Sequence, residues 1–466
     1  MDMRYTEYQR PGGASSRTDM IFRIASIAGL VVLVFVAGVL MTASGIFPAP
    51  QISRAYAAAK ALYAQQTVYQ DVYRSDLWYP ARDQRKGVTT YVRGAAQDGL
   101  TLYAAGNAAA AFLVDMDGRL VHEWRKPFST LWPDGSGPIR DPRPDAFVHF
   151  RNAHVLPNGD LIALYEGTGD TPYGYGVVKL DRNSEVVWKY PGRAHHQLSI
   201  GSDGRIYVLT HEFVDDMPQD LGHLARPRLE DFLVVLSPNG EELMKIRLLS
   251  AVAQSRYRHM LYTVSSFALA DPLHANAVDY IDRQAAARFA FGEEGQLLLS
   301  FRELGAVAVL DPDTQSIVWA TRGPWIGQHD PDIVANGNIL LFDNYGAYGG
   351  PQGISRVIEI DPRNLRIAWE YRGSADAPLA SRIRADQQRL ANGNTLITES
   401  EAGRLVEVTR AGEIVWEFIN PVRGGPDGQM VPMMAWAQRL DPAAFDPGFR
   451  EAVLGDGGRD TAARGP

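Results

Sequence analysis

The stretch from Val357 to Trp369 reads VIEIDPRNLRIAW, and it decides the fold because its pattern occurs six times along the chain. Each copy has an alternating apolar run, a polar turn and a second apolar run that usually ends in tryptophan. A period of two around such a turn is typical of a β-hairpin. The six copies are Phe112–Trp124, Val177–Trp188, Leu233–Met244, Val307–Trp319, Val357–Trp369 and Leu405–Trp416.

A second family of hairpins lies between these copies and is built on Asn-Gly or a similar pair. Such pairs favour the tight type I′ turn, in which both central residues need φ > 0. They occur at Asn158-Gly159, Asp203-Gly204, Glu294-Gly295, Asn336-Gly337 and Asn392-Gly393. One inner and one outer hairpin make a four-stranded unit, which cannot bury its apolar face alone. The sequence therefore predicts an all-β fold, a six-bladed β-propeller of four-stranded blades.

The chain opens with an outer hairpin that has no inner partner before it. We expect the missing strands to come from Met433–Leu440 near the C-terminus and from Leu100–Tyr103. Pairing the two ends of the chain closes the ring and leaves no open sheet edge. The predicted propeller spans residues 99–442, and a flexible tail is expected over 443–466.

The composition excludes several kinds of chemistry. The 466 residues include no cysteine, so disulfides, thiolate nucleophiles, iron–sulfur centres and cysteine-based zinc sites are ruled out. A net charge of −8 gives no basic surface for nucleic acid. The chain has no phosphate-binding loop and no G-x-S-x-G motif. We expect no cofactor and no nucleic-acid partner.

Residues 24–46 form an uncharged apolar stretch, IASIAGLVVLVFVAGVLMTASGI, long enough to cross a hydrocarbon core of ~30 Å as a helix. Arginines before it favour a cytoplasmic N-terminal segment over residues 1–23. A cleaved secretory signal with its site at Ala55–Ala57 is the alternative, but such signals have only about 7–15 apolar residues. The prediction is a single-pass inner (cytoplasmic) membrane protein, with a helical stalk over 47–98 and its propeller on the periplasmic side.

Histidines recur at one point of the repeat, on the strand expected to line the central channel. His196 and His329 each precede their turn by seven residues, and His274 follows an insertion in the next blade. Guanidinium forks and imidazoles suit a tetrahedral oxyanion, and imidazole can act as nucleophile or as acid and base. Because a propeller gathers equivalent positions around its axis, we expect the recurrent histidines to share a cavity with Arg151, His154, His195, Asn276, Arg302 and Arg384.

Other interpretations of these residues remain open at this point. A single histidine on a strand usually packs or makes one hydrogen bond, which is the interpretation for His122, His149, His223 and His259. Three histidines can bind zinc or copper, but Arg302 beside them disfavours a cation, and no metal site is predicted. Asp330 and Asp332 are assigned to the loop and blade rather than to calcium. The loop Gly167–Gly176 is expected at the channel mouth, with Tyr173 and Tyr175 available to an aromatic ligand.

Four segments together resemble the arylsulfate sulfotransferase family, over roughly residues 100–440. The resemblance implies a six-bladed propeller of the bacterial envelope that moves a sulfuryl group between phenols without a nucleotide donor, through a transiently sulfated histidine. Members are typically soluble and periplasmic, whereas this chain has a predicted anchor. The segments are AHHQLSIGSDGRIYVLTHE (Ala194–Glu212), HANAV (His274–Val278), LLLSFRELGAVAVLDPDTQSIVW (Leu297–Trp319) and QHDPDIVANGNILLFDN (Gln328–Asn344).

The resemblance also implies roles for individual residues. His329 matches the nucleophile, His274 and Asn276 match the H-x-N motif, Arg302 matches the sulfate-binding arginine, and His196 matches the second-blade histidine. His196 is followed by Gln197, where the family commonly has aspartate, and Asp279–Glu294 is longer than expected. Substrate contacts are predicted for Asn276, Arg151, His154, Arg384 and His195.

These observations predict a membrane-anchored aryl sulfotransferase that acts on small aryl sulfates and phenols through a sulfohistidine. His196 would protonate the leaving oxygen and later deprotonate the acceptor. A non-catalytic envelope propeller that binds a ligand or protein partner is the alternative, and a quinone- or metal-dependent dehydrogenase is a third. Convergence of His196, His274, Arg302 and His329 on one cavity discriminates between them.

Overall fold

The computed structural model describes residues 17–44, part of the segment 46–70 (46–49, 51, 52, 55, 56, 59, 63, 67, 69 and 70), and residues 71–455 apart from 217, 347–354 and 375. Predictions that fall on residues 1–16, on most of 45–68 and on 456–466 lie outside the described residues. The chain divides into two compact units, Met1–Gln70 and Asp71–Pro466.

The first unit contains helix α1 (Arg17–Ser44). Its segment Asp19–Ser44 is long and apolar enough to cross a membrane, with a mean hydropathy of 2.8. A signal sequence near the N-terminus meets the same criterion, so α1 is a candidate membrane span or signal sequence.

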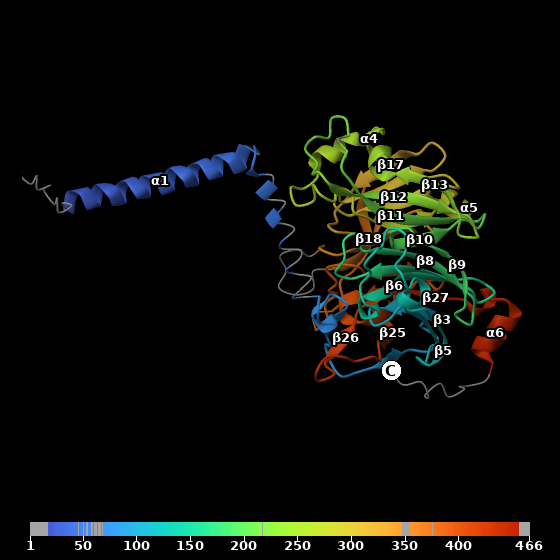
Figure 1. Cartoon of the computed structure of the whole chain (residues 1–466). Coiled ribbons are helices and arrows are strands. Elements are labelled where there is room, and N and C mark those ends of the chain that lie inside the picture. The colour runs from blue at the N-terminus through green and yellow to red at the C-terminus, as the bar shows by residue number, and fades with distance from the viewer. Residues whose placement is uncertain are drawn as a thin grey trace, which may run out of the picture. The chain divides into compact units, whose positions relative to one another are not determined.

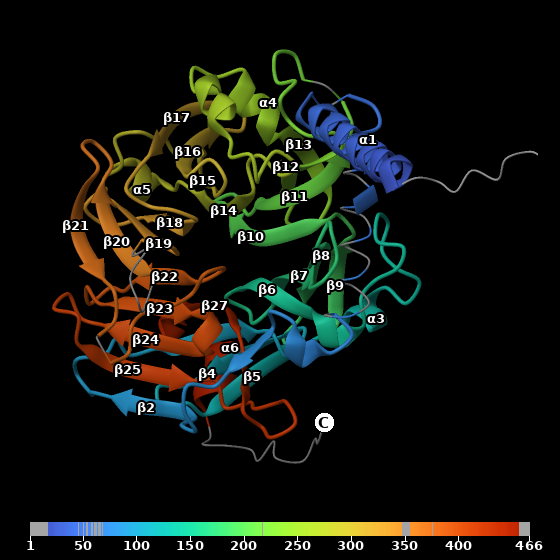
Figure 2. The same cartoon turned by 90° about the vertical axis from the view of Figure 1, so that its left-hand side faces the viewer.

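The second unit is a six-bladed β-propeller, whose sheets surround a central axis in Figure 2. From the axis outward, blade 1 contains β27 (Met434–Leu440), β3 (Leu100–Ala105), β4 (Ala110–Val114) and β5 (Leu120–Arg125), and blade 2 contains β6 (Val148–Val155), β7 (Leu161–Gly167), β8 (Gly174–Leu180) and β9 (Val186–Tyr190). Blade 3 contains β10 (Ala194–Ile200), β11 (Ile206–Val214), β12 (Arg228–Leu236) and β13 (Glu242–Arg247), and blade 4 contains β14 (Ala275–Tyr280), β15 (Leu297–Phe301), β16 (Ala306–Asp311) and β17 (Ser316–Arg322). Blade 5 contains β18 (His329–Ile333), β19 (Ile339–Asp343), β20 (Arg356–Asp361) and β21 (Arg366–Tyr371), and blade 6 contains β22 (Asp386–Arg389), β23 (Thr395–Glu399), β24 (Arg404–Val408) and β25 (Ile414–Ile419).

Short helices occupy the connections between strands. They are η1 (Val72–Arg74), α3 (Phe128–Leu131), η2 (Asp145–Phe147), α4 (Leu248–Ala253), η3 (Arg258–Thr263), α5 (Arg283–Ala286), η4 (Ser400–Ala402), η5 (Pro442–Ala444) and α6 (Pro447–Leu454). Because β14 pairs with β15 from Tyr280 to Leu297, the connection between them contains α5. The tight hairpin predicted at Glu294-Gly295 is therefore wrong.

The ring closes as the sequence predicts. Strand β27 pairs with β3 so that Ala437 faces Tyr103 and Leu440 faces Leu100. The two ends of the chain thus build blade 1 together, and their red and blue strands lie side by side in Figures 1 and 2. Closure leaves no unpaired edge at the junction.

The six predicted outer hairpins are present, and all share one irregularity. Each has one residue at positive φ in its turn and, three residues further on, a register shift that leaves one residue of the second strand unpaired as a β-bulge. The left-handed residues are Gly118, Ser184, Gly240, Gln315, Leu365 and Gly412.

The tryptophans that end these hairpins connect neighbouring blades. The indole N–H of Trp124 donates to the carbonyl of Gly159 (3.0 Å), and that of Trp188 donates to the carbonyl of Pro238 (3.0 Å). Trp369 donates in the same way to Arg410 (2.9 Å). Each acceptor lies in a turn of the following blade, so the recurrent tryptophan stabilises the ring rather than its own hairpin.

Two segments differ from the expected stalk and tail. Strand β1 (Trp78–Pro80) pairs with β26 (Met430–Pro432), and β2 (Gly87–Tyr91) adds a fifth strand to blade 6, so the helical stalk expected over 47–98 does not extend to these residues. A short polar strand that covers a sheet edge protects it from other chains. In the tail, α6 buries Phe449 against Trp124, so residues 447–454 are ordered by packing.

Candidate active site

The innermost strands of five blades are irregular at the residues singled out by the sequence. Register shifts lie between Phe150 and Asn152, Ala194 and Leu198, Ala275 and Ala277, His329 and Asp332, and Met434 and Trp436. Side chains of a regular strand point alternately to its two faces, and a bulge of this kind changes the direction of one of them. Positive φ angles, rare for residues other than glycine and concentrated at functional sites, occur at His274 (47°), Asp330 (50°), His196 (55°) and Arg384 (63°).

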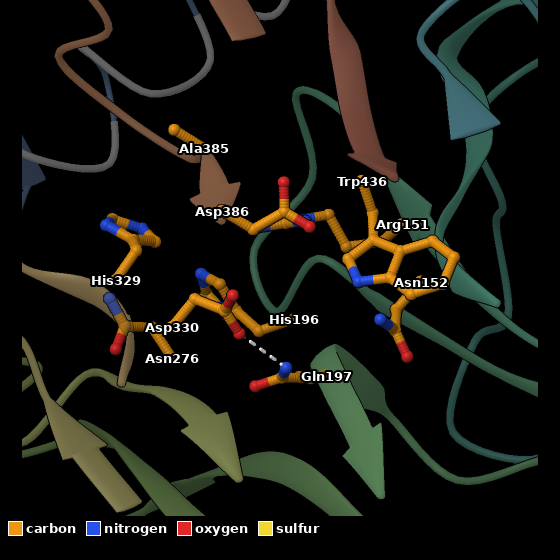
Figure 3. A pocket seen from close by; sticks show the side chains of 10 residues that line it. All are labelled: Arg151, Asn152, His196, Gln197, Asn276, His329, Asp330, Ala385, Asp386 and Trp436. Atoms are coloured by element: carbon orange, nitrogen blue, oxygen red, sulfur yellow. Dashed lines mark hydrogen bonds between the residues drawn. The ribbon is translucent and has the colours of Figure 1, made fainter. Parts of the chain in front are cut away.

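These irregular segments surround a small central cavity (Figure 3). Its volume of about 10 Å³ gives room for one water molecule. The lining residues are Arg151, Asn152, His196, Gln197, Asn276, His329, Asp330, Ala385, Asp386 and Trp436.

His329 is held in one tautomer by its neighbours. Its Nδ1 lies 2.8 Å from Oδ1 of Asn344 and 3.0 Å from the carbonyl of Gly327. Both partners can only accept, so Nδ1 carries the proton and Nε2 keeps its lone pair. Burial, followed by the charges of Arg151 and Arg302, holds the pKa of His329 well below its usual value. The imidazole is therefore neutral and presents a nucleophilic nitrogen.

The orientation of Asn344 is fixed in turn. Its Nδ2 donates to the carbonyls of Ser381 (2.8 Å) and Arg384 (2.9 Å). Those two acceptors hold the amide nitrogen away from His329 and turn the amide oxygen toward it. Asn344 thus sets the His329 tautomer together with the carbonyl of Gly327, and it is fully buried.

His196 and His274 lie beside the nucleophile candidate. The ring centre of His196 is 6.3 Å from that of His329 and 5.3 Å from that of His274. Burial, His195 and His274 hold the pKa of His196 well below its usual value. Burial also opposes the charged form of His274, but the carboxylate of Asp271, 2.6 Å from its Nδ1, leaves the pKa of His274 raised overall. The site therefore combines two neutral imidazoles with one that favours the cation.

Two predicted substrate contacts are positioned by main-chain carbonyls at the cavity wall. Nδ2 of Asn276 donates to the carbonyl of Gln328 (2.8 Å), and Nη1 of Arg151 donates to that of Ala435 (2.6 Å). Oδ1 of Asn276 and Nε of Arg151 are buried without a hydrogen-bond partner. Nε of Arg151 is 3.8 Å from Glu166, which partly balances its charge.

Five of the nine predicted residues do not line the cavity: His274, which lies beside it, and Arg302, Arg384, His154 and His195. The guanidinium of Arg302 pairs with Glu303, although its charge is close enough to influence His329. Arg384 pairs with Asp76 at 2.8 Å, in the segment before β1. His154 bonds the carbonyl of Leu198 (3.0 Å), and burial lowers its pKa to about 4. His195 lies behind His196, with 2.8 Å between their Nδ1 atoms.

The family model for arylsulfotransferase (ASST) matches residues 152–421, which include every cavity residue except Arg151 and Trp436. The chain belongs to the arylsulfotransferase family. Membership agrees with the resemblance found in the sequence and supports a sulfotransferase enzyme. No curated protein matches the chain.

Solved propellers resemble this chain only distantly. A Bacteroides caccae protein of unknown function has 14% identity and a TM-score of 0.43, over 73% of this chain and 98% of its own. Streptogramin B lyase has 14% identity and a TM-score of 0.39, over 78% and 97%. An inactive virginiamycin B lyase from Staphylococcus aureus, solved with quinupristin, has 10% identity and a TM-score of 0.38, over 73% and 87%. Similarities of this size carry no functional conclusion.

Several residues of the cavity were missed by sequence reasoning. Gln197 and Asp330 meet across the cavity at 2.7 Å (Figure 3), and burial raises the pKa of both Asp330 and Asp386. Asn344 ends the quoted motif but received no role. The motif Gln328–Asn344 that contains Asn344 could have indicated its role, whereas Asp386 and Trp436 lie in segments that match no motif.

The two tyrosines of the loop Gly167–Gly176, Tyr173 and Tyr175, lie in different environments. Tyr175 is buried in the apolar core and donates to Asp170 (2.9 Å), so the prediction that it is available to a ligand is wrong. The ring of Tyr173 contacts those of His195, His196, His211 and His274, with centres 4.4–6.4 Å apart. Tyr173 therefore packs over the histidine cluster.

Among the described residues, one group has the spacing of a metal site. The ligand atoms of His195, His211 and Asp231 lie within 4.8 Å of one another. However, the N–H of Gly174 donates to Nε2 of His211 (3.0 Å), which puts the proton of a neutral His211 on Nδ1. A protonated Nδ1 cannot bind a metal, so the hydrogen bonding argues against this site.

Proposed function

We propose that the protein transfers a sulfuryl group from a phenolic sulfate ester to a phenolic acceptor through a sulfohistidine at His329. The supporting observation is the fixed tautomer of His329, whose Nδ1 has two acceptors while Nε2 keeps its lone pair. Family membership supplies the reaction class, and the cavity supplies neighbours suited to an anion.

In the first step, Nε2 of His329 attacks sulfur, the bond from sulfur to the aryl oxygen breaks, and phenoxide leaves with the electron pair. Cationic and amide donors stabilise the charge on the sulfuryl oxygens, as they do in phosphoryl transfer. Arg151 and Asn276 line the cavity, and His274 next to it favours its charged form. These three groups are the candidates for holding the sulfuryl oxygens.

Substrate binding has to widen the cavity, because its volume of about 10 Å³ holds a water but not a sulfate. Arg302 is the side chain with a reason to move, since among the described residues its guanidinium pairs with the neighbouring Glu303. A sulfate oxygen pair offers the same bidentate acceptor as a carboxylate. Arg302 would exchange Glu303 for the sulfate when the donor enters.

His196 is the proposed acid and base. The centre of its ring lies 6.3 Å from that of His329. At this distance the sulfur can contact His329 while the aryl oxygen bound to that sulfur contacts His196. It would protonate the departing phenoxide and later accept the proton of the attacking phenol. Because both half-reactions use the same histidine, the proton released in one is returned in the other.

We also propose that α1 remains uncleaved and holds the propeller on the periplasmic side of the inner membrane. The helix is long and apolar enough to span a bilayer. The test is the mature N-terminus of membrane-fraction protein and its protease sensitivity in spheroplasts. Release of a shortened soluble chain would show that α1 is a signal sequence.

The reaction is tested by trapping the intermediate. Wild-type protein incubated with 4-nitrophenyl sulfate and quenched should carry one added sulfuryl group on the peptide with His329, and His329→Ala should lose both the modification and transfer. His122→Ala is the matched control, because His122 lies on the outermost strand β5, where its ring contacts Trp124, Phe449 and the carbonyl of Arg182. An unmodified His329 in wild type, with no transfer to several phenols, would reject the proposal.

A further inference from the structure

Behind His196, away from the cavity, three side chains stand in line. Nδ1 of His196 is 2.8 Å from Nδ1 of His195, and Nε2 of His195 is 3.4 Å from Oδ1 of Asp231. His195 is fully buried, Asp231 is 2% exposed and His196 is 8% exposed. The line thus runs from the cavity wall into the interior of blade 3, where water cannot replace any member.

The hydrogen bonds restrict where protons can lie in this line. Oδ2 of Asp231 accepts the N–H of Ala275 (2.7 Å), which orients Oδ1 toward His195. Two imidazole nitrogens 2.8 Å apart share one proton, because two protons would collide and none would leave two lone pairs facing each other. Nε2 of His195 lies 3.4 Å from Oδ1 of Asp231, which is an ion-pair distance without the alignment of a hydrogen bond. The carboxylate of Asp231 therefore acts on a proton at Nε2 of His195 through its charge.

We propose that Asp231 and His195 form a proton relay that stores the catalytic proton between the two half-reactions and passes it through His196. This inference rests on the proposed sulfuryl transfer. Asp231 and His195 do not touch substrate, so they are positioning residues, and they act through His196.

The relay has two states that differ by one proton. In the loaded state, His195 carries protons on both nitrogens and His196 carries one on Nε2, facing the leaving oxygen. When phenoxide departs, it takes the Nε2 proton of His196, and the Nδ1 proton of His195 moves to Nδ1 of His196. The second phenol reverses both transfers as its oxygen attacks sulfur. No proton leaves the site during a full cycle.

The positive charge of the loaded state belongs on His195 rather than on His196. His196 faces cationic or potentially cationic groups in Arg151, His274 and His329, while its main-chain N–H is held by Glu166 at 2.8 Å. His195 instead faces Asp231 and stacks on neutral His211, with ring centres 4.2 Å apart. Tyr173, Asp271 and Arg193 are the remaining titratable or charged groups around this cluster. The relay keeps His196 neutral in both states.

The test compares two donors that differ in their need for a proton. Phenyl sulfate releases a basic phenoxide, whereas 4-nitrophenyl sulfate releases a stable one. General acid catalysis is worth ~100-fold or more, so His195→Gln and Asp231→Asn should slow transfer from phenyl sulfate by about 100-fold and from the nitrophenyl ester by only about threefold. His211→Gln is the matched control, because His211 packs on His195 but lies outside the line. Any loss in that variant should be equal for both donors.

Three outcomes would overturn the relay. Equal losses for both donors in His195→Gln and Asp231→Asn would show a structural role only. If His211→Gln lost as much transfer from phenyl sulfate relative to the nitrophenyl ester as His195→Gln does, the effect would not be specific to the residues of the line. One transition metal per chain in purified wild type, absent from Asp231→Asn, would make the three residues a metal site. In each case wild type still forms sulfohistidine, whereas failure of the proposed function leaves wild type unmodified.

Discussion

The outer hairpins and the innermost strands of the propeller both interrupt regular pairing, but in different ways. The outer bulge lies in the second strand of the hairpin in all six blades, three residues after a left-handed turn residue that is glycine in three of them. The inner irregularities lie at residues that differ from blade to blade, such as His196, Asn276 and Asp330. The repeat is therefore conserved within this chain where it makes the fold, and diverges where it makes the site.

The two regions also differ in how well their polar groups are satisfied. The outer indoles of Trp124, Trp188 and Trp369 each have a carbonyl partner. Around the axis, buried atoms of Asn276 and Asp386 have none. An unpaired buried polar atom costs about 1–3 kcal/mol, so the channel is less stable than its surroundings and is available to a ligand. Changes near the axis should lower activity, and changes in the outer hairpins should lower stability.

The largest effect is expected from Asn344→Leu. Loss of the amide oxygen lets Nε2 of His329 carry the proton, and errors of tautomer in catalytic histidines cost up to ~10⁴-fold. We expect transfer to fall ~100- to 1000-fold, measured with purified, folded protein. Ser355→Ala is the control, because Ser355 bonds the carbonyls of Asn344 and Ser381 but not His329. A similar loss in both variants would mean that Asn344 matters only for packing.

Arg302 and Glu303 give the next effect. Arg302→Ala should reduce kcat/KM for the sulfate donor by about 100-fold through loss of a charged contact in the transition state. Glu303→Gln frees Arg302 from its ion pair and should lower KM a few-fold. Steady-state kinetics measure both. A higher KM in Glu303→Gln would show that the pair holds Arg302 in its working position.

The pH dependence should report His274. Its folded pKa is raised through Asp271, so its stabilising charge is fully present below the unfolded pKa of about 6.5 and is lost as pH rises through the folded pKa. Donor binding should weaken over the same alkaline range. In Asp271→Asn, burial dominates and lowers the pKa, so the fall in kcat/KM should move to lower pH, with about a tenfold loss at pH 7. An unchanged profile would exclude His274 as the titrating group.

Trp416 tests the outer region. Its indole donates to the carbonyl of Met116 (2.9 Å) and joins blade 6 to blade 1, where the ring closes. Trp416→Phe should lower the free energy of unfolding by about 2 kcal/mol through the lost bond and volume, with kcat unchanged. Trp369→Phe, whose bond is exposed, should cost less than about 1 kcal/mol. Denaturant titration measures both free energies of unfolding. A lower kcat in either variant would contradict the claim that changes in the outer hairpins affect stability alone.

The smallest effect is expected at the left-handed positions of the outer turns. Gln315 is exposed and has φ of 54°, a conformation that glycine adopts without strain, so Gln315→Gly should stabilise the protein by up to about 1 kcal/mol. Gly118→Ala should do the opposite, because φ is 81° and the new Cβ would lie 2.9 Å from Val88. Thermal unfolding distinguishes the two signs. Stabilisation by both substitutions would contradict the assignment of these turns.

Local pattern was sufficient for much of the fold and for part of the site. Alternation and turn residues predicted the six outer hairpins, and the unpaired first hairpin predicted that β27 joins β3. Recurrence at one place in the repeat predicted that His196 and His329 meet. It did not reveal Asn344 or Asp231, because a polar residue within or just after a strand has the same pattern whether it faces solvent or an imidazole.

The amino-acid sequence by itself determined the number of blades, the closure of the ring and the types of residue that reach the axis. These follow from periodicity, which is a property of neighbours in the chain. Only the tertiary structure decided that Arg302 turns to Glu303, that Asn344 sets the tautomer of His329, and that Asp231 stands behind His195. The last two contacts join separate segments of the chain at distances of a few ångströms, and bulges that shift a strand by one residue select them.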